Sequence, residues 1–254
     1  MIKLKVSPSS AAFMLGNLCV TEYAHGCLRA ILMSGYGIRE DSIAEVNERV
    51  GASHESWYAR SLTAPVFGAE VPVKGNITDT VVYSGRADFI TQHDGFRVIH
   101  ETKATVTVKT KTSVITNGNY KMNWLAQLLF YMIRTNTTRG KIISGYYVEH
   151  EGGLFENKAS REFKVEIDDV GNVQVDGQFS GYNVQDQLAH QMGCAKVLSE
   201  NILWDRPDGA EKAYGSPCHF CPFKQTCLEY DLGTITSVEE FVASARKNVE
   251  NKLK

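Results

Sequence analysis

The residues of this chain with the clearest capacity for chemistry lie on one expected β-hairpin. Asp94-Gly95 stands between two strand-like runs, and this dipeptide is the strongest short signal for a two-residue hairpin loop. If it forms the loop, His93 faces Phe96, and counting back along both strands sets Asp88 opposite Glu101. Cross-strand partners point to the same face of a sheet. The spacing therefore predicts two carboxylates side by side.

Lys103 lies two residues beyond Glu101 and shares its face of the strand. Directly opposed carboxylates repel one another, and a divalent cation between them reverses that effect. Such oxygen ligands suit Mg²⁺ or Mn²⁺, which keep waters and take up phosphate oxygens. With Lys103 acting on an attacking water or on developing charge, the trio could serve metal-assisted phosphodiester hydrolysis. The alternative is a solvent-facing hairpin with an incidental Glu–Lys pair.

Three further side chains could assist such a site. Gln127 and Tyr131 are four residues apart in a strongly helical segment, hence on one helix face, where either could touch a phosphate or a catalytic group. Packing of that face with a tyrosine hydroxyl at the rim is the other interpretation. His54 could be a neutral imidazole ligand to a metal, or a hydrogen-bonded core histidine.

Half of a thiolate metal site lies near the C-terminus. A CxxC motif is followed by five residues and a third cysteine: Cys218, Cys221 and Cys227. A fourth ligand has to come from elsewhere, and Cys19 and Cys27 stand near the N-terminus. Tetrahedral thiolate sites hold zinc or an iron–sulfur cluster, and the spacing alone does not separate the two. His219 could complete a zinc site only with awkward geometry.

The pattern of apolar residues predicts the elements that position these groups. Residues 11–33 and a segment from Asp41-Ser42 to about Leu62 are expected to be helical. Alternation with period two predicts strands between residues 70 and 109. Further expected elements are helices at 119–134 and 184–203, strands at 142–148 and 163–167, and a last helix opened by a capping box at Ser237. The order indicates an α/β fold with a mixed sheet and helices packed around it.

Composition excludes several classes of protein. The 254 residues are 43% hydrophobic and 22% charged, which argues against disorder, collagen-like repeats and a coiled coil. The N-terminus lacks the apolar core of a signal peptide, and no apolar run approaches membrane-spanning length. We therefore expect a cytoplasmic protein without a membrane partner.

Charge is balanced overall but not along the chain. The 27 basic residues face 29 acidic ones, yet the stretch from Glu101 to Lys141 is basic and the stretch from Ile142 to Glu200 is acidic. A basic middle is typical of a nucleic-acid site, because phosphate contacts dominate such affinity. A solvated basic face balanced by an acidic one is the alternative.

Together these pieces resemble the RecB-like branch of the PD-(D/E)XK nuclease superfamily. More narrowly, they are similar to its iron–sulfur members: the CRISPR-associated Cas-four exonuclease family, AddB-type nuclease domains and their phage relatives. The similarity spans roughly residues 7–230. Its motifs, in the family's order, are an SPSS start, Cys19-Val-Thr-Glu-Tyr23, Gly51-Ala-Ser-His54, Glu70-Val-Pro-Val73, Gly85-Arg-Ala-Asp88, Glu101-Thr-Lys103, Gln127-Leu-Leu-Phe-Tyr131 and the cysteine cluster.

The resemblance implies one domain with a restriction-endonuclease-like core. Residues 1–65 would form a helical N-terminal region with one cluster cysteine, residues 66–183 the nuclease core, and residues 184–254 the C-terminal helices with the remaining cysteines. Asp88 and Glu101 would bind the catalytic Mg²⁺ or Mn²⁺, helped by His54 and the main-chain carbonyl of Thr102. Lys103 would act on the attacking water. In the family's QxxxY motif, the two substrate-side positions would be Gln127 and Tyr131.

The resemblance also implies a [4Fe-4S] cluster held by Cys218, Cys221, Cys227 and an N-terminal cysteine. Cys19 is preferred, because Cys-x-x-x-Tyr23 fits the family's Cys-Pro-Arg-x-[Phe/Tyr] segment. The chain departs from that segment at Val20-Thr21, so Cys27 competes for the role. Glu55 beside His54 adds a second possible metal ligand.

The function implied is a metal-dependent exonuclease acting on single-stranded DNA or overhangs. A role in CRISPR spacer acquisition, and so in antiviral defence, would involve integration proteins as partners. A phage or recombination enzyme outside CRISPR, with recombination proteins as partners, is the nearest alternative. A catalytically idle DNA-binding subunit and a zinc-stabilised binding module are alternatives from other classes.

Overall fold

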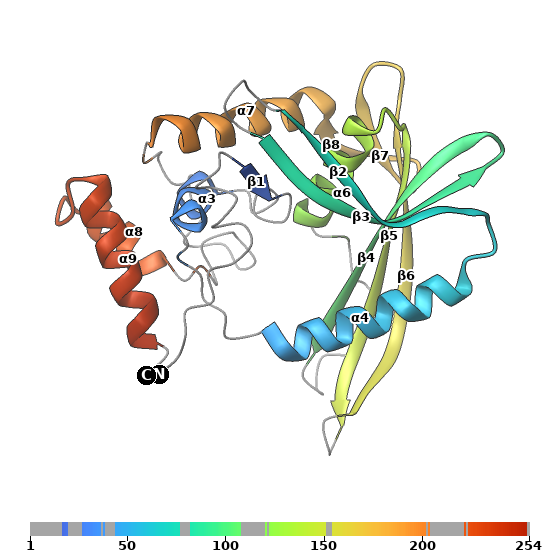
Figure 1. The fold of residues 1–254 in the computed structure, drawn as a ribbon, viewed down its shortest axis with the longest axis horizontal. Coiled ribbons are helices and arrows are strands. Elements are labelled where there is room, and N and C mark those ends of the chain that lie inside the picture. The colour runs from blue at the N-terminus through green and yellow to red at the C-terminus, as the bar shows by residue number, and fades with distance from the viewer. Residues whose placement is uncertain are drawn as a thin grey trace. The chain divides into compact units, whose positions relative to one another are not determined.

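The computed structural model describes residues 17–19, 27–36, 38, 44–76, 82–107, 120, 122–150, 154–201, 203, 221 and 223–252. The chain divides into two compact units. One unit comprises residues 43–73 and 85–188, and the other comprises residues 1–42, 74–84 and 189–254. Figure 1 labels the elements of both.

A mixed sheet forms the centre of the unit comprising residues 43–73 and 85–188. Seven strands follow one another in the order β2-β3-β4-β5-β6-β7-β8. Their bounds are β2 Val66–Asn76, β3 Val82–His93, β4 Phe96–Thr107, β5 Arg139–His150, β6 Leu154–Ile167, β7 Asn172–Val175 and β8 Gln178–Asn183. Strands β4 and β5 are parallel, and the pairs from β5 to β8 are antiparallel. The α/β fold with a mixed sheet and flanking helices is thus confirmed, whereas β7 and β8 were not predicted.

The predicted hairpin register is confirmed over the paired residues. His93 faces Phe96, and the pairing continues to Phe89 and His100. Asp94 and Gly95 have φ angles of 50° and 81°. Left-handed conformations at both loop positions are what a two-residue hairpin of this twist requires, and they explain the Asp-Gly pair.

Two helices cover opposite faces of the sheet (Figure 1). Helix α4 (Ala44–Ser61) packs on β4, and helix α6 (Met122–Arg134) packs on β4 and β5. Gly140 lies beneath α6, since a Cβ there would stand 2.7 Å from the Met132 sulfur, and Gly145 lies beneath α4, 2.5 Å from the His54 ring. Gly140 is the β5 partner of Ile99. Alternation along β4 therefore turns Ile99 and Glu101 toward α6.

The α4 face is fixed by a buried hydrogen-bonded chain. The Tyr58 hydroxyl lies 2.7 Å from His100 Nδ1, and the Thr91 hydroxyl lies 2.7 Å from His100 Nε2. Burial lowers the pKa of His100 to about 4, so the imidazole is neutral and both hydroxyls satisfy it. This chain ties α4, β3 and β4 together at the residue that precedes Glu101.

Gly145→Ala is expected to destabilise the fold by about 1–3 kcal/mol, because the new methyl group would overlap the His54 ring and force α4 from the sheet. Equilibrium urea unfolding measures the change. The matched control is Gly51→Ala on α4, where a Cβ meets nothing within 4 Å. That substitution should stabilise the helix by roughly 0.5–1 kcal/mol. Equal effects of the two substitutions would contradict the packing described.

The other unit is mainly helical. It contains α3 (Leu28–Gly35), most of α7 (Val184–Glu200), α8 (Lys224–Asp231) and α9 (Val238–Lys252). Their apolar faces meet in one core cluster: Cys27, Leu32, Met33, Ile38, Val197, Phe223, Cys227, Ile235, Phe241 and Ala245. The capping box at Ser237 is confirmed in part. The Ser237 hydroxyl accepts the Glu240 N–H at 3.2 Å, but the Glu240 carboxylate caps Thr236 instead.

The prediction of a helix over residues 11–33 is wrong in part. Asn17–Cys19 forms the short strand β1, which pairs in parallel with Val82–Ser84 at the start of β3. Helix α3 begins only at Leu28. The apolar residues Leu18 and Cys19 suit either structure, and a partner strand distant in sequence decides between them.

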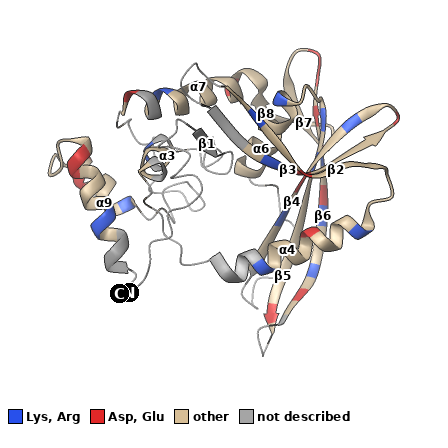
Figure 2. Cartoon of the chain, in the orientation of Figure 1, with Lys and Arg blue, Asp and Glu red and all other residues tan. Residues whose placement is uncertain are grey.

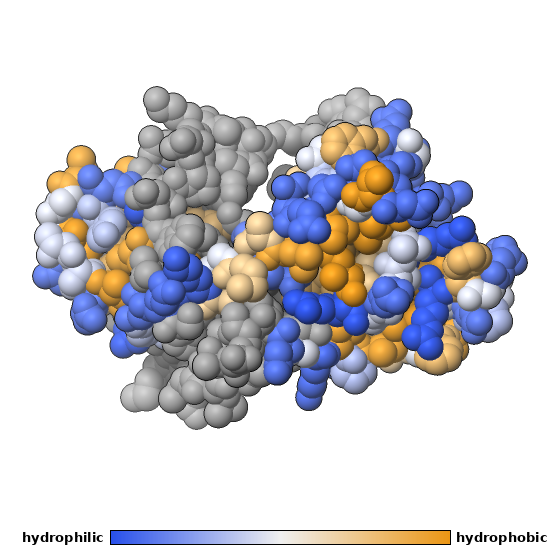
Figure 3. All heavy atoms as spheres, turned by 90° about the horizontal axis from the view of Figure 1, so that it is seen from above, coloured by the Kyte–Doolittle hydropathy of each residue, from blue (hydrophilic) through white to orange (hydrophobic). Residues whose placement is uncertain are grey.

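Within the described residues, no helix is long and apolar enough to cross a membrane. Figure 3 shows apolar patches bordered by hydrophilic residues on the face that it displays.

Candidate active site

Asp88 lies where the two hairpin strands begin to separate. Its Oδ2 accepts both the main-chain N–H and the hydroxyl of Thr102, each at 2.7 Å. A continued ladder would give the Thr102 N–H to a main-chain carbonyl of β3, so the Asp88 side chain takes over that acceptor role. The carboxylate is thereby held one position beyond the last paired residues. The sequence predicted a role for the Thr102 carbonyl but not for its hydroxyl.

Glu101 is almost completely buried, with 1% of its side chain exposed. Its Oε1 accepts a hydrogen bond from the Lys103 ammonium, which is itself 22% exposed. Burial raises the pKa of Glu101 to about 8; Lys103 opposes this shift, and the charge of Asp88 adds to it. Asp88, Glu101 and Lys103 thus form one electrostatically coupled group. Within it, Glu101 is buried and the Lys103 ammonium is partly exposed to solvent.

Glu101 Oε2 is the atom that best tests the predicted metal. It is buried and has no hydrogen-bond partner among the described residues. An unsatisfied buried carboxylate oxygen is costly, and a divalent cation would satisfy it. Within the described ranges, no three His, Cys, Asp or Glu side chains gather closely enough to hold a metal by themselves. Two carboxylates plus waters or phosphate suffice for Mg²⁺, so Asp88 and Glu101 fit this ion.

Charged residues surround Asp88 and Lys103. Glu55 on α4 is half-buried, and its pKa is raised by burial and by the charges of Asp88 and Glu70, against Arg86 and Lys103. The Arg86 guanidinium donates to the Glu70 carboxylate at 3.1 Å in an exposed ion pair. The prediction of Glu55 as an additional ligand is untested, but its coupling to Asp88 brings this α4 residue near the site.

His54 is fully buried between α4 and β5. Its Nε2 lies 3.2 Å from the Ile143 carbonyl, and its Nδ1 lies 3.1 Å from the Tyr147 hydroxyl. A carbonyl only accepts, so Nε2 carries the hydrogen and Nδ1 accepts from Tyr147. Burial lowers the pKa of His54, which keeps the ring neutral. Metal binding by His54 stays a prediction, and in this arrangement it requires Nδ1 to exchange Tyr147 for the ion.

Gln127 and Tyr131 both lie on α6, the helix that covers the Glu101 face of the sheet. Both side chains are buried, Gln127 at 8% and Tyr131 at 2% exposure. Gln187 Nε2, near the start of α7, donates to the Ala126 carbonyl of this helix at 2.9 Å. Contact of these two residues with a phosphate stays a prediction.

The basic stretch is only partly described. Lys109, Lys111 and Lys121 lie outside the described residues. Lys141 pairs with Glu162 at 2.9 Å, and Arg139 lies over the Phe96 ring. Figure 2 shows basic and acidic residues interspersed over the strands. The prediction of a DNA path along this stretch is therefore untested.

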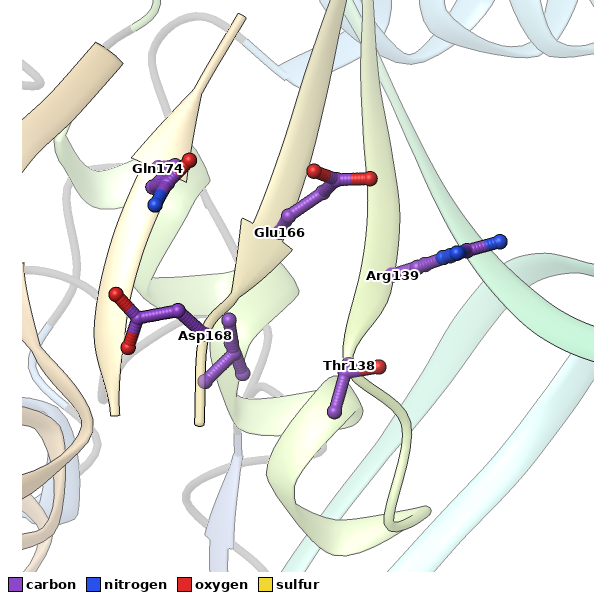
Figure 4. A pocket seen from close by; sticks show the side chains of 6 residues that line it. Thr138, Arg139, Glu166, Asp168 and Gln174 are labelled. Atoms are coloured by element: carbon purple, nitrogen blue, oxygen red, sulfur yellow. The ribbon is translucent and has the colours of Figure 1, made fainter. Parts of the chain in front are cut away.

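A separate pocket of about 190 Å³ lies where β5 begins and β6 ends. It is lined by Thr138, Arg139, Glu166, Ile167, Asp168 and Gln174. In Figure 4 the Arg139 side chain points away from Asp168 and Gln174. Asp168 instead accepts the N–H groups of Val170 and Asn172 at 3.0 and 2.8 Å, as a turn residue does. The pocket therefore gathers no catalytic group and includes none of the predicted site residues.

The predicted cluster cysteines are described in part. Cys218 lies outside the described residues, and for Cys19 only the backbone is described. Cys227 belongs to the same apolar cluster as Cys27, and Cys221 packs against that cluster. All three are free thiols. Cys27 and Cys227 thus share one apolar cluster, but the three described cysteines do not gather closely enough in this structure to hold a metal ion by themselves.

Arg29 is a buried residue that the sequence interpretation missed. It is 2% exposed, pairs with Asp231 at 2.9 Å, and stacks 4.9 Å from the Tyr230 ring centroid. Burial alone would lower its pKa, but hydrogen bonds to Asp231 and Cys227 raise it. The signal present in the sequence is a charged residue inside an apolar run, Cys27-Leu28-Arg29-Ala30-Ile31.

Comparison with known proteins gives distant structural similarity only. No protein-family model and no curated protein matches the chain. The structure of SSO0001 is 15% identical, with a TM-score of 0.49, over 84% of this chain and 85% of that one. The alkaline exonuclease LHK-Exo from Laribacter hongkongensis is 12% identical, with a TM-score of 0.44, over 76% of this chain and 92% of that one. Its complex with dAMP gives a TM-score of 0.45 at 11% identity over the same shares of the two chains.

Proposed function

We propose that this chain is a metal-dependent DNA nuclease of the PD-(D/E)XK type. The observation that carries the proposal is Glu101, a buried carboxylate that is bonded to Lys103 and coupled to Asp88, and whose second oxygen has no donor among the residues that the structure describes. A structural ion pair in this position would satisfy both oxygens. A cation-binding carboxylate would not.

The reaction proposed is hydrolysis of a phosphodiester by water. A Mg²⁺ or Mn²⁺ ion held by Asp88 and Glu101 would supply Lewis acidity and lower the pKa of a bound water. Thr102 holds Asp88 through two hydrogen bonds and so fixes that carboxylate before substrate arrives. Lys103 brings a positive charge to phosphate oxygens as their negative charge grows. No covalent intermediate is needed.

The test uses single-stranded DNA labelled at the 5′ or the 3′ end, with Mn²⁺, Mg²⁺ or EDTA. Wild type should degrade the DNA only with metal, and Asp88→Ala should be inactive. The matched control is Glu156→Ala, which removes an exposed carboxylate on β6 and should leave the rate unchanged. Product sizes from the two labels give the polarity of an exonuclease. If wild type bound the DNA without cleaving it, the nuclease proposal would be wrong, and the chain would instead be a catalytically idle DNA-binding subunit.

We also propose an iron–sulfur cluster held by Cys218, Cys221, Cys227 and an N-terminal cysteine. Its support is the packing of Cys221 and Cys227 at one apolar core, where exclusion of water suits a thiolate-bound cluster. Cys27 belongs to the same core, so our proposal assigns it, rather than Cys19, as the fourth ligand. The biological setting proposed remains CRISPR spacer acquisition or phage and recombination DNA processing.

Cys27→Ser is expected to lose most of the bound iron and the absorption near 400 nm in anaerobically purified protein, whereas Cys19→Ser retains both. The reason is that serine cannot replace a thiolate ligand in the core. Iron content per chain and the visible spectrum measure the effect. Cys194→Ser, at a buried position on α7, is the control for loss of a core thiol. If only Cys19→Ser lost iron, Cys19 would be the fourth ligand. If wild type were colourless and contained zinc, the proposal of an iron–sulfur cluster would be wrong.

A further inference from the structure

An exposed aromatic ring stacked by an arginine lies close to the candidate active site. Phe67, near the start of β2, has 62% of its surface exposed. The Arg97 guanidinium carbon on β4 lies 4.8 Å from the centroid of the Phe67 ring. The stacked arginine makes this exposed ring part of a flat, cationic surface.

Two contacts locate Phe67 beside Asp88. The Gln92 N–H donates to the Pro65 carbonyl at 3.2 Å, and Arg86 donates to Glu70. β2 therefore runs antiparallel to β3, and Phe67 lies opposite the part of β3 between Asp88 and Gln92. Asp88 and residue 90 are about 7 Å apart along a strand. Phe67 lies one strand further across, about 5 Å away, so its backbone is roughly 8–9 Å from that of Asp88.

The Phe67 ring also lies on the side of the sheet that carries Glu101. Gln92 is the cross-strand partner of Arg97, and alternation along β4 puts Arg97, Ile99 and Glu101 on one face. Because Arg97 stacks on Phe67, the ring belongs to this face.

The charge at this position favours a nucleic acid over an apolar protein partner. Among the described residues, no carboxylate lies within ion-pair distance of Arg97. Burying an arginine without a counter-ion in a protein interface is costly. A phosphate supplies the counter-charge, and a base supplies a flat surface for stacking.

We infer that Phe67 and Arg97 form a stacking platform for a base of a single strand whose neighbouring phosphate occupies the Asp88 site. The inference rests on the proposed nuclease function and names the part of the substrate recognised. Single-strand binding uses aromatic platforms beside positive charge, and it is tolerant of sequence because every base has a flat face. A paired duplex hides its bases, so the platform selects unpaired DNA.

A second ring provides a matched control. Phe96 has 51% of its surface exposed, and the Arg139 guanidinium carbon lies 4.2 Å from its centroid. Phe96 alternates with Arg97 and therefore points to the opposite face, away from Glu101. Phe67 and Phe96 are thus both exposed rings stacked by an arginine, but they lie on opposite faces of the sheet.

The experiment measures binding of full-length protein in EDTA, at fixed salt, to two fluorescent probes: a short thymidine oligonucleotide, and the same backbone with abasic sites. Phe67→Ala should weaken binding to thymidine about tenfold and leave the abasic probe unaffected. Phe67→Trp should restore thymidine binding, which a merely destabilised variant would not do. Phe96→Ala should bind both probes as wild type does.

Several outcomes would overturn the platform. Phe67→Ala could bind thymidine as tightly as wild type, or lose equal affinity for both probes. Phe96→Ala could lose as much thymidine affinity as Phe67→Ala, or wild type could bind neither probe. A wild-type dimer that Phe67→Ala dissociates in sedimentation would assign the ring to a second copy instead. Cleavage by wild type in Mn²⁺, measured in parallel, separates the two proposals. Cleavage with unchanged Phe67→Ala affinity removes the platform alone, and base-dependent binding without cleavage removes the nuclease alone.

Discussion

Glu101→Gln is expected to lower the rate of DNA cleavage by about a thousandfold or more. Glutamine keeps the shape of the side chain but removes the negative charge that would hold the cation. Metal-assisted charge stabilisation contributes several kcal/mol to such a reaction, and each 1.36 kcal/mol is a factor of ten in rate. Initial rates at saturating Mn²⁺ measure the loss. Glu162→Gln, which neutralises the exposed partner of Lys141, is the control and should cleave as wild type does.

The same substitution has a second readout in the absence of metal. Folding raises the pKa of Glu101 from 4.5 to about 8, chiefly through burial. The folded state therefore binds this proton more tightly than the unfolded state does. The stabilisation that this provides is fully present below pH 4.5, the pKa of Glu101 in the unfolded chain. It is lost as the pH rises through the folded pKa. The free energy of unfolding of wild type should thus fall between about pH 4.5 and pH 8, and Glu101→Gln should flatten this dependence.

Added Mg²⁺ should have an effect on the free energy of unfolding that grows with pH, whereas the effect of the Glu101 proton shrinks. The ion competes with the proton for Glu101, so it should stabilise wild type more at pH 8 than at pH 6. Glu101→Gln should show little stabilisation at either pH. Equal stabilisation of both proteins would contradict the assignment of Glu101 as a ligand, even if cleavage were lost.

Arg29→Met is expected to destabilise the helical unit by about 2 kcal/mol. Removing one partner of a buried ion pair costs roughly 3–5 kcal/mol, and partial exposure of Asp231 reduces this. The stack on Tyr230 and the hydrogen bond to Cys227 are lost as well. Urea unfolding followed by circular dichroism measures the change in the free energy of unfolding.

Two other variants sharpen the Arg29 experiment. Arg29→Lys keeps the charge but not the planar group that bonds and stacks at once, so it should recover only part of the stability. Arg86→Met removes an exposed ion pair with Glu70 and should cost less than about 1 kcal/mol. Equal costs at Arg29 and Arg86 would contradict the structural role of burial.

Local patterns predicted much of the sheet and of the candidate site. The Asp94-Gly95 turn fixes the hairpin register, because only certain residues adopt positive φ easily. The period of the apolar residues predicted α4 and α6 correctly and placed β5 and β6 approximately, and the capping box at Ser237 predicted α9. It failed for Asn17–Cys19, whose strand exists through pairing with Val82–Ser84 far along the chain. Short strands depend on partners that a local window does not contain.

The sequence by itself determined which residue types stand on the hairpin and that Asp88, Glu101 and Lys103 fall close together. Only the tertiary structure decided what surrounds them. It buries Glu101 beneath α6, bonds Asp88 to the Thr102 hydroxyl, gives both His54 nitrogens a partner, and stacks Arg97 on the Phe67 ring. These features depend on contacts between segments distant in sequence. Burial and unpaired oxygens arise from such contacts, and they give the ionisable groups their chemistry.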